Sequence, residues 1–281
     1  MSIPLTVRRQ YFVSQHGLSR FAGFLANATQ PTLKNYLIRY FLQRHTVNLS
    51  EAEIEDPYAY ASFNDFFTRK LKKELRPISP HPTDLVSPAD STLYQSGQIK
   101  ADTLLHAKNH NYTLSSLLGK KDDFSESFVD GSYACFYLAP HDYHRVHIPS
   151  EGRLLKMRYI PGRLFSVNKS TAQHVENIFA RNERLVCFFE NEIGKFVVIL
   201  VGAMIVGSIH TSWAGKIAPG NQGMMEIDYS AKPIHLSKGE DIGHFCLGST
   251  AIVLFDKSAS LAETLKPDQK ILMGQKIGTW G

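Results

Sequence analysis

The sequence predicts an α+β protein in which N-terminal amphipathic helices pack on a mostly antiparallel β core of the sandwich or hybrid-barrel type. The first 75 residues place apolar side chains at helical spacing, whereas from about residue 84 short apolar runs alternate with Gly, Pro, Asn and Asp. The regular alternation of strands and helices that a parallel sheet requires is missing from the sequence. We therefore expect a helical region over residues 1–75 and a β-rich region over residues 76–281.

Two amphipathic helices are expected within the first 50 residues, with Pro31 between them. The apolar side chains of the second helix recur at i, i+3, i+4, i+7 and i+8, which places five of them on one face: Leu33, Tyr36, Leu37, Tyr40 and Phe41. A weaker stripe marks the first helix and consists of Leu18, Phe21, Phe24 and Leu25. A third helix is expected from Phe63 to Leu71, with Ser62 or Asn64 near its start.

Positive charge is concentrated in the first of these regions. The chain has 31 Lys and Arg against 26 Asp and Glu, a formal net charge of +5, and residues 1–50 contain six basic residues but no acidic one. The rest of the chain therefore has 25 basic and 26 acidic residues. Basic, aromatic and amphipathic helices suit an anionic membrane surface, where they lie in the interface plane. Packing on the body of the protein is the alternative interpretation.

The β core is expected from residue 84 onward. Six apolar runs bounded by turn-forming residues predict its strands: residues 133–138, 145–148, 153–159, 185–189, 195–201 and 251–255. The longest apolar run, residues 197–207, is much shorter than the roughly 20 residues that span a bilayer. We therefore interpret it as one or two buried strands.

Cysteine content and the N-terminal sequence predict the compartment. Three cysteines, Cys135, Cys187 and Cys246, are too few and too irregularly spaced for a disulfide framework or a cysteine zinc site. Arg8 and Arg9 are not followed by the uncharged apolar stretch of an export signal. We expect a protein that is neither exported nor membrane-spanning and that attaches peripherally to the cytoplasmic face of the cell membrane.

Three histidines in the run HDYHRVHIP suggest either a metal site or acid/base chemistry. On a strand, His144 is an odd number of residues from His141 and from His147, so it points to the opposite face. Ligands that point apart do not converge on one ion, and no carboxylate or cysteine ligand motif accompanies them. We therefore predict no bound metal and expect acid/base or structural roles for these histidines.

The Gly248-Ser249 peptide is a candidate for backbone chemistry. Gly248 has no side chain to shield its carbonyl group, and it permits a strained backbone that brings the next hydroxyl toward the carbonyl carbon. The G-x-S-x-G motif of a serine hydrolase is missing. A plain turn before a strand is the alternative interpretation of the tetrapeptide LGST.

Seven sequence blocks follow one another in this order: FNDFFTRKLKKELRP at residues 63–77, SPADST at 87–92, YLAPHDYHRVHIP at 137–149, GRLFSVN at 162–168, ARNERL at 180–185, VGAMIVGSI at 201–209 and KGEDIGHFCLGSTAIVLF at 238–255. Together they closely resemble the bacterial phosphatidylserine decarboxylase proenzymes. The resemblance covers nearly the whole chain from about residue 55 onward. The basic helical start fits the peripheral membrane attachment of that family.

The resemblance implies a self-processing enzyme. The aspartate, second histidine and serine of the family's motifs fall on Asp90, His147 and Ser249, which implies a charge relay for cleavage between Gly248 and Ser249. Cleavage would give a large chain of residues 1–248 and a small chain of residues 249–281, with Ser249 converted into a covalent pyruvoyl group. Many members carry Gly shortly after the aspartate, so we expect a turn of different shape after Asp90.

The resemblance also implies a second reaction, the decarboxylation of phosphatidylserine to phosphatidylethanolamine and carbon dioxide. The pyruvoyl group would condense with the substrate amine and take up the electrons left by carbon dioxide, the task of pyridoxal phosphate in other decarboxylases. The family's first histidine falls on His144, which we expect to move protons in this reaction. A hydrogen-bonded core histidine is the alternative role for this residue.

Two other functions are kept as alternatives. A pyruvoyl decarboxylase of a soluble amino acid would not need the basic residues 1–50. A membrane-peripheral binding module with a hybrid-barrel core and no catalysis is suggested by KGEDIG and MGQKIG, which resemble barrel turns. The sequence leaves a homodimer open, and we expect no nucleic-acid partner because the β-rich region is close to neutral.

Overall fold

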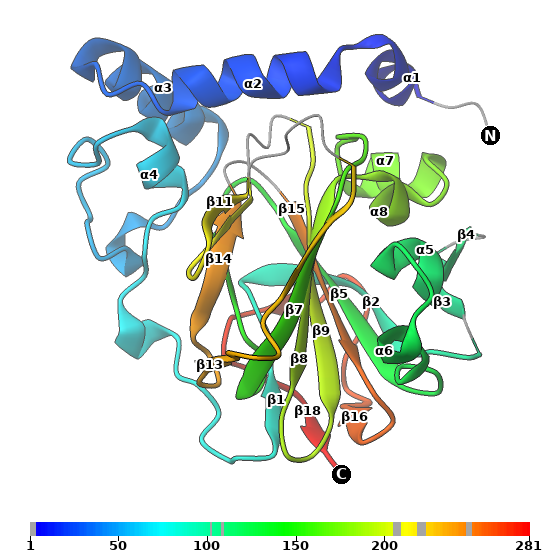
Figure 1. Ribbon diagram of the computed structural model, residues 1–281. Helices are drawn as coiled ribbons and strands as arrows, with labels where there is room; N and C mark the ends of the chain where they lie inside the picture. The colour runs from blue at the N-terminus through cyan, green and yellow to red at the C-terminus, as the bar shows by residue number, and fades with distance from the viewer. Residues whose placement is uncertain (1–3, 102, 108–109, 205–208, 218–222, 246–248) are drawn as a thin grey trace.

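The computed structural model describes residues 4–101, 103–107, 110–204, 209–217, 223–245 and 249–281 (Figure 1). The helices are α1 (Leu5–Phe12), α2 (Gln15–Ala26), α3 (Pro31–Arg44), α4 (Phe63–Phe67), α5 (Leu114–Leu118), α6 (Asp123–Glu126), α7 (Lys169–His174) and α8 (Ile178–Arg181), with short 3-10 helices η1 (Leu49–Glu51) and η2 (Lys73–Leu75). The strands are β1 (Asp84–Val86), β2 (Ser91–Gln98), β3 (Thr103–Ala107), β4 (His110–Thr113), β5 (Ser132–Leu138), β6 (Arg145–His147), β7 (Gly152–Ile160), β8 (Arg184–Glu190), β9 (Lys195–Val201), β10 (Ile209–Thr211), β11 (Gly215–Ile217), β12 (Met225–Asp228), β13 (Ile234–Leu236), β14 (Asp241–Phe245), β15 (Ser249–Phe255), β16 (Ala259–Leu261), β17 (Lys270–Ile271) and β18 (Lys276–Trp280).

The strands pair in an antiparallel manner, and the largest sheet has the order β12-β7-β8-β9-β15-β5-β2-β17, with β13 also paired with β7. A second sheet has the order β11-β10-β14-β6, and a third has the order β1-β18-β16. Figure 1 shows α5 to α8 on one side of the large sheet and β14 on the other. The expected α+β class with antiparallel strands is confirmed, although the described strands form open sheets rather than a closed barrel.

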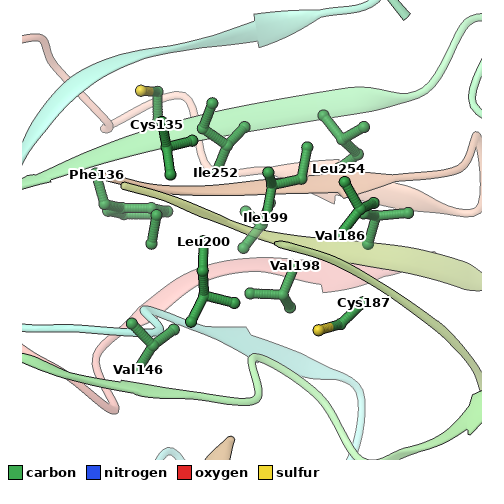
Figure 2. Packing of buried hydrophobic residues seen from close by; sticks show 14 of the residues in the cluster. Cys135, Phe136, Val146, Val186, Cys187, Val198, Ile199, Leu200, Ile252 and Leu254 are labelled. Atoms are coloured by element: carbon green, nitrogen blue, oxygen red, sulfur yellow. The ribbon is translucent and has the colours of Figure 1, made fainter. Parts of the chain in front are cut away.

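The middle of the large sheet is the core of the protein. Strands β8, β9, β15 and β5 are buried almost throughout, on both faces. Ile252 of β15 pairs with Ile199 of β9, and Figure 2 shows Leu200 pointing to the opposite side, toward Val146 of β6. Burial on both faces explains why these strands are uninterrupted apolar runs in the sequence. The second sheet therefore shares one core with the first.

The six predicted strands correspond to β5, β6, β7, β8, β9 and β15, each with bounds within two residues of the prediction. In the apolar run over residues 197–207, β9 ends at Val201, and residues 205–207 lie outside the described part of the chain. Cys135 and Cys187 are buried free thiols, and Cys246 also lies outside the described residues.

The predicted helix over residues 63–71 is wrong beyond Phe67, where α4 ends. Ser62 caps this short helix as expected, because its Oγ accepts a hydrogen bond from the backbone N–H of Asp65. Residues 70–72 do not continue the helix but pair with residues 51–53 through two backbone hydrogen bonds of 2.9 and 3.0 Å. Pairing with a segment about 20 residues away therefore overrides the local preference for a helix.

The apolar stripe predicted for α3 is only partly buried in the protein. Tyr36 and Tyr40 are exposed, and the face that packs against the protein carries Lys34, Ile38 and Phe41. The Lys34 ammonium group donates hydrogen bonds to the carbonyl oxygens of Tyr58 and Tyr60, both at 2.7 Å. These two acceptors satisfy a charge that would otherwise be costly to bury.

Two buried glutamines tie α1 and α2 to the core. Gln10 Nε2 donates to Thr171 Oγ1 at 3.2 Å, and Gln10 Oε1 accepts from Ser166 N at 3.0 Å. Gln15 Oε1 accepts from Leu164 N at 2.8 Å, and Gln15 Nε2 donates to the Gln10 carbonyl oxygen at 2.8 Å. The two helices are therefore anchored on the loop that follows β7, and Figure 1 shows α2 lying across one end of the large sheet.

The Gln15→Ala variant is expected to loosen α1 and α2 from the core, because it leaves the buried Leu164 N–H without a partner. An unpaired buried donor costs about 1–3 kcal/mol, so amide exchange over residues 5–26 should accelerate by about tenfold or more. Hydrogen exchange followed by mass spectrometry measures this. Gln43→Ala, at an exposed position of α3, is the matched control. Equal acceleration in the two variants would contradict the anchoring role.

Candidate active site

Three neighbouring strands bring Asp90 and Ser249 to the same end of the large sheet. β15 begins at Ser249, which pairs with Leu138 at the end of β5. On the other side of β5 lies β2, which begins immediately after Asp90. Adjacent strands are about 4.8 Å apart, so the backbones of β15 and β2 are separated by about 10 Å. The strand order therefore places two of the predicted residues at the same end of the sheet.

The loop at residues 87–90 is held against β6 by its own backbone. His147 N donates to the Pro88 carbonyl oxygen at 2.8 Å. Within the loop, Ser87 Oγ donates to the Ala89 carbonyl oxygen at 2.9 Å, which fixes the turn. The second predicted histidine and the loop that carries the predicted aspartate are thus joined by a direct hydrogen bond, although the bond is between main-chain atoms.

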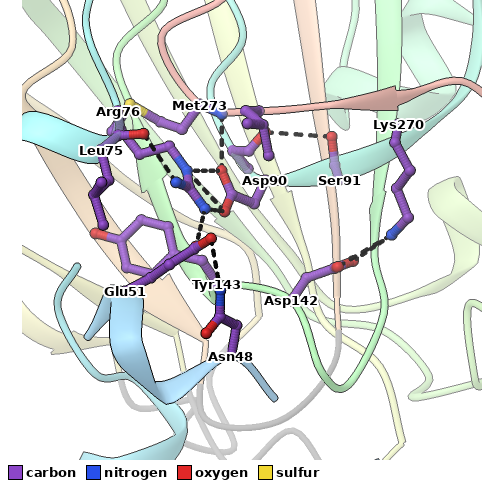
Figure 3. Close-up of polar contacts among 12 residues, drawn as sticks. Asn48, Glu51, Leu75, Arg76, Asp90, Ser91, Asp142, Tyr143, Lys270 and Met273 are labelled. Carbon is purple, nitrogen blue, oxygen red and sulfur yellow. Dashed lines mark hydrogen bonds and ion pairs between the residues drawn. The ribbon is translucent and has the colours of Figure 1, made fainter. Parts of the chain in front are cut away.

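Asp90 is buried, and both of its oxygens accept hydrogen bonds from Arg76 (Figure 3). Arg76 Nε lies 2.8 Å from Oδ1 and 3.0 Å from Oδ2, and Nη2 lies 2.6 Å from Oδ2. Met273 N donates to Oδ1 at 2.9 Å, and Arg76 Nη2 also reaches Glu51 Oε2 at 2.6 Å. Hydrogen bonding to Asp90 is the largest cause that raises the pKa of Arg76. A permanent cation therefore fixes the orientation of the carboxylate.

His147 is buried, and its two ring nitrogens have partners other than Asp90. Nδ1 lies 2.9 Å from the Gly239 carbonyl oxygen, and Nε2 lies 3.1 Å from the Tyr143 hydroxyl. Because a carbonyl oxygen only accepts, we assign the proton to Nδ1, which leaves Nε2 to accept from the tyrosine. Burial lowers the pKa of His147, while the carboxylates of Asp241 and Asp90 act in the opposite direction. The ring is thus a neutral base with its lone pair at Nε2.

Ser249 is fully buried at the first position of β15. Within the described ranges its Oγ has no hydrogen-bond partner, and the same is true of Thr250 Oγ1. The structure thus brings Asp90 and Ser249 to one sheet end and joins His147 to the Asp90 loop. It forms no side-chain hydrogen bond between any two of these three residues in the described part of the chain. Gly248, the other half of the predicted cleavage site, lies outside the described residues.

His144 is fully buried on the loop between β5 and β6. Its ring stacks on Phe67 of α4, with the ring centroids 4.1 Å apart, and Nε2 lies 3.3 Å from the Pro140 carbonyl oxygen. Nδ1 has no partner among the residues described. Burial, followed by the charge of Arg69, lowers the pKa of His144 to about 3. His144 is therefore neutral near pH 7, and its Nδ1 offers an unused lone pair.

Three residues that contact the predicted ones could not be identified from the sequence: Arg76, Tyr143 and Gly239. Each falls within one of the seven sequence blocks, which is the signal that was available. Arg76 is 14 residues from Asp90, and Gly239 is 92 residues from His147. In both pairs the two residues belong to different elements or loops, so only the folded chain brings these groups together.

Two cavities flank the ion pair between Arg76 and Asp90, and Arg76 and Tyr143 line both. One cavity of about 390 Å³ reaches His147, and the other, of about 320 Å³, reaches Asp90. Both volumes are at the lower end of the range for small-molecule sites. The predicted residues therefore border spaces that a small polar headgroup could enter.

Comparison with known protein families identifies the class of chemistry. A family model described as phosphatidylserine decarboxylase matches residues 63–279, which include Asp90, His144, His147 and Ser249. A second model, described as PSD, matches residues 5–46. The chain is therefore an enzyme of the decarboxylase class.

Curated relatives extend this match over nearly the whole chain. Proteins named phosphatidylserine decarboxylase proenzyme include that of Alcanivorax borkumensis, 46% identical over 98% of this chain and 96% of the relative. The protein of that name from Pseudomonas fluorescens is 45% identical over 99% and 98%, and the one from Vibrio parahaemolyticus is 48% identical over 91% of each chain. The chain belongs to the phosphatidylserine decarboxylase family, as its sequence blocks predicted.

Acidic pH is expected to destabilise the fold through His144. Its pKa falls from 6.5 to about 3 on folding, so below pH 6.5 the unfolded chain binds more protons than the folded one. The stability that neutral His144 contributes is complete above pH 6.5 and is lost as the pH falls toward the folded-state pKa, by about 2 kcal/mol near pH 5. Urea unfolding at several pH values should show a flatter decline for His144→Gln than for the unmodified protein.

The control for this experiment is His235→Gln, which removes an exposed histidine of β13. Its unfolding free energy should follow the pH dependence of the unmodified protein. If the pH dependence of the unfolding free energy is reduced equally in the two glutamine variants, burial of His144 does not cause that dependence.

Proposed function

We propose that the protein makes its own pyruvoyl group from Ser249 and uses it to decarboxylate phosphatidylserine. Family membership gives the reaction itself, in which phosphatidylserine is converted to phosphatidylethanolamine with release of carbon dioxide. The observation that supports the internal origin of the group is the buried Ser249 at the first position of β15, with an Oγ that has no partner in the described structure. That hydroxyl contributes no hydrogen bond to the fold there, which leaves it available for a reaction.

The surroundings of Ser249 fit a cofactor that is part of the chain. A pyruvoyl group of this kind needs a serine that directly follows a cleavable peptide bond, and Ser249 follows Gly248. When present, the group supplies an electron sink for the electron pair that carbon dioxide leaves behind. Full burial at position 249 keeps bulk water from this group, so electrostatic interactions there are strong.

Self-cleavage requires that a serine hydroxyl attack the carbonyl carbon immediately before it. The Ser249 Oγ bonds to the Gly248 carbonyl carbon as a base takes its proton, and the peptide C–N bond breaks with protonation of the nitrogen, which gives an ester. Loss of the Ser249 Cα proton then expels the Gly248 carboxylate and leaves dehydroalanine. Addition of water and loss of ammonia produce the pyruvoyl group at position 249.

His147 is the base that the geometry supports best for the first of these steps. Its Nε2 lone pair is available to a hydroxyl donor, and in the uncut chain the donor is Tyr143. Proton transfer from Ser249 therefore requires that Nε2 exchange the tyrosine hydroxyl for that of the serine. The carboxylates of Asp241 and, less strongly, Asp90 favour the cationic ring that results, and Arg76 holds the Asp90 carboxylate in place.

His144 is proposed to move protons during decarboxylation. A neutral imidazole is required to accept a proton, and burial keeps the ring of His144 neutral near pH 7. The stack on Phe67 and the contact of Nε2 with the Pro140 carbonyl oxygen hold the ring while Nδ1 stays unoccupied among the described groups. This position is one loop away from the end of β5, the strand that pairs with Ser249.

The Ser249→Ala variant is expected to remain a single full-length chain on denaturing electrophoresis, because no hydroxyl is left to attack. The unmodified protein should give a large and a small band and release carbon dioxide from phosphatidylserine labelled in the carboxyl group. His147→Ala should also stay uncut, whereas His144→Ala should be cut but release no carbon dioxide. A single full-length band from active unmodified protein would contradict the self-cleavage, and activity in cut His144→Ala would contradict the role of His144.

The chain offers a matched control for the serine substitution. Ser132 is also buried, its Oγ also lacks a partner among the described residues, and it pairs with Phe255 at the far end of β15. Ser132→Ala should be cut and active like the unmodified protein. Loss of cleavage in this variant as well would point to general damage of the sheet rather than to loss of a nucleophile.

Membrane attachment through α1 to α3 is the second part of the proposal. These helices expose large apolar side chains, among them Phe12 at 89% and Phe24 at 75% exposed, alongside the basic residues of a segment without acidic residues. No helix in the described part of the chain is both long and apolar enough to cross a membrane. We therefore infer peripheral attachment, on the cytoplasmic face, where anionic lipids would attract the basic helices.

The double variant Phe12→Ser, Phe24→Ser is expected to bind vesicles of anionic phospholipid at least about tenfold more weakly, because each exposed ring contributes apolar area to the interface. Vesicle flotation at low and high salt measures this, and salt should weaken binding of the unmodified protein. Ile193→Ser removes an apolar residue that is 44% exposed on the turn after β8, away from these helices, and serves as control. Unchanged flotation of the double variant would contradict attachment through these helices.

A further inference from the structure

Arg69 is a buried cation that uses little of its hydrogen-bonding capacity. Its side chain is almost fully buried, with 4% of the residue exposed, and Nε and Nη1 have no hydrogen-bond partner among the described residues. The third nitrogen, Nη2, lies 3.4 Å from the His141 carbonyl oxygen, a long hydrogen bond. The guanidinium carbon lies 5.7 Å from the centroid of the Phe66 ring. A buried cation is costly to maintain unless an anion or several acceptors meet it.

Arg184 shows how this protein satisfies an arginine that serves only the fold. It is as deeply buried as Arg69, but its three nitrogens donate to four backbone carbonyl oxygens at distances of 2.6 to 3.0 Å. No such set of carbonyl oxygens surrounds Arg69 in the described structure. Within the described structure, Arg69 therefore differs from an arginine that serves only the fold, because most of its donors are left for a ligand.

Arg69 lines the cavity of about 320 Å³ that also reaches Asp90. The other cations of its wall are already engaged in ion pairs, which Figure 3 shows: Arg76 with Asp90 and Glu51, and Lys270 with Asp142. Among the described residues that line this cavity, Arg69 is therefore the cation without a carboxylate partner. An anion that enters the cavity would lie beside a guanidinium group whose hydrogen bond within the described structure is the long one to the His141 carbonyl oxygen.

The cavity lies between the helical region and the reacting end of the sheet. Thr46 and Asn48, which follow α3, form part of its wall, so a lipid held by the proposed membrane surface could place its headgroup there. Phe67, two residues before Arg69, stacks on His144, and the charge of Arg69 contributes to lowering the pKa of His144. A headgroup bound at Arg69 would thus have its amino acid part near the proposed proton carrier.

We propose that Arg69 binds the phosphodiester group of phosphatidylserine and so orients the headgroup for reaction. The proposal rests on the decarboxylase function. A guanidinium group presents parallel N–H donors that match two oxygens of a phosphate. The serine carboxylate is the poorer ligand, because an ion pair there would stabilise the group that must leave as neutral carbon dioxide. The phosphodiester keeps its charge throughout, so binding it holds substrate and transition state equally.

The test compares Arg69→Met and Arg69→Lys with the unmodified protein, after electrophoresis has shown that each is cut. Carbon dioxide release from short-chain phosphatidylserine in detergent micelles gives kcat and KM. Inhibition by short-chain phosphatidylethanolamine gives an inhibition constant for a lipid that keeps the phosphate but lacks the carboxylate. For Arg69→Met we expect KM and this inhibition constant to rise together, each by about tenfold or more, with kcat changed less than about threefold. Arg69→Lys should recover part of both.

Lys257→Met is the control, because it removes an exposed positive charge beyond the far end of β15 and should leave all three parameters unchanged. An unchanged KM in Arg69→Met would overturn the proposal. A raised KM with unchanged inhibition by phosphatidylethanolamine would also overturn it, because Arg69 would then bind the carboxylate. Failure of the variants to be cut would assign Arg69 to self-processing instead. Absence of carbon dioxide release from the unmodified protein would refute the decarboxylase function itself.

Discussion

The register of β15 between β5 and β9 is the constraint on which the rest of the site depends. Every residue from Ser249 to Phe255 pairs with β5, and all but the first also pair with β9. A slip of one residue would turn the Ser249 side chain to the other face of the sheet. Because β15 is buried on both faces, burial alone does not select the register. The fit of side-chain volumes in a close-packed core must select it, so the position of Ser249 is set by packing along the whole strand.

Much of the fold could be predicted because its signals are local. The central strands are buried on both faces, and each is a short apolar run that stands out in the sequence. The errors arose where a distant partner decided the outcome. Residues 70–72 pair with residues 51–53 and leave the predicted helix. Lys34 is buried because the carbonyl oxygens of Tyr58 and Tyr60 accept hydrogen bonds from its ammonium group. The spacing of apolar residues along a helix gives no information about either of these partners.

The site was predicted as a set of residues but not as a set of contacts. Motif resemblance pointed to Asp90, His147 and Ser249. In the folded chain, however, Asp90 forms hydrogen bonds with Arg76, and the ring of His147 forms them with Tyr143 and a backbone carbonyl group. Ion pairs and hydrogen bonds of this kind depend on which loops meet at one end of a sheet. A side chain's role can therefore follow from a motif, whereas its partners in the uncut chain follow only from the tertiary structure.

The place of β15 in the sheet determines what a cut before Ser249 can do to the molecule. β15 lies between β5 and β9, and β18, near the end of the chain, pairs with β1. The short fragment would therefore contain a central strand of the large sheet. Its dissociation would break the backbone hydrogen bonds of β15 to both β5 and β9 and would expose apolar side chains on both faces. Burial of that area holds the fragments together without any covalent link. Processing would then be a change of connectivity inside a permanent complex, whose small subunit cannot be exchanged for another without unfolding.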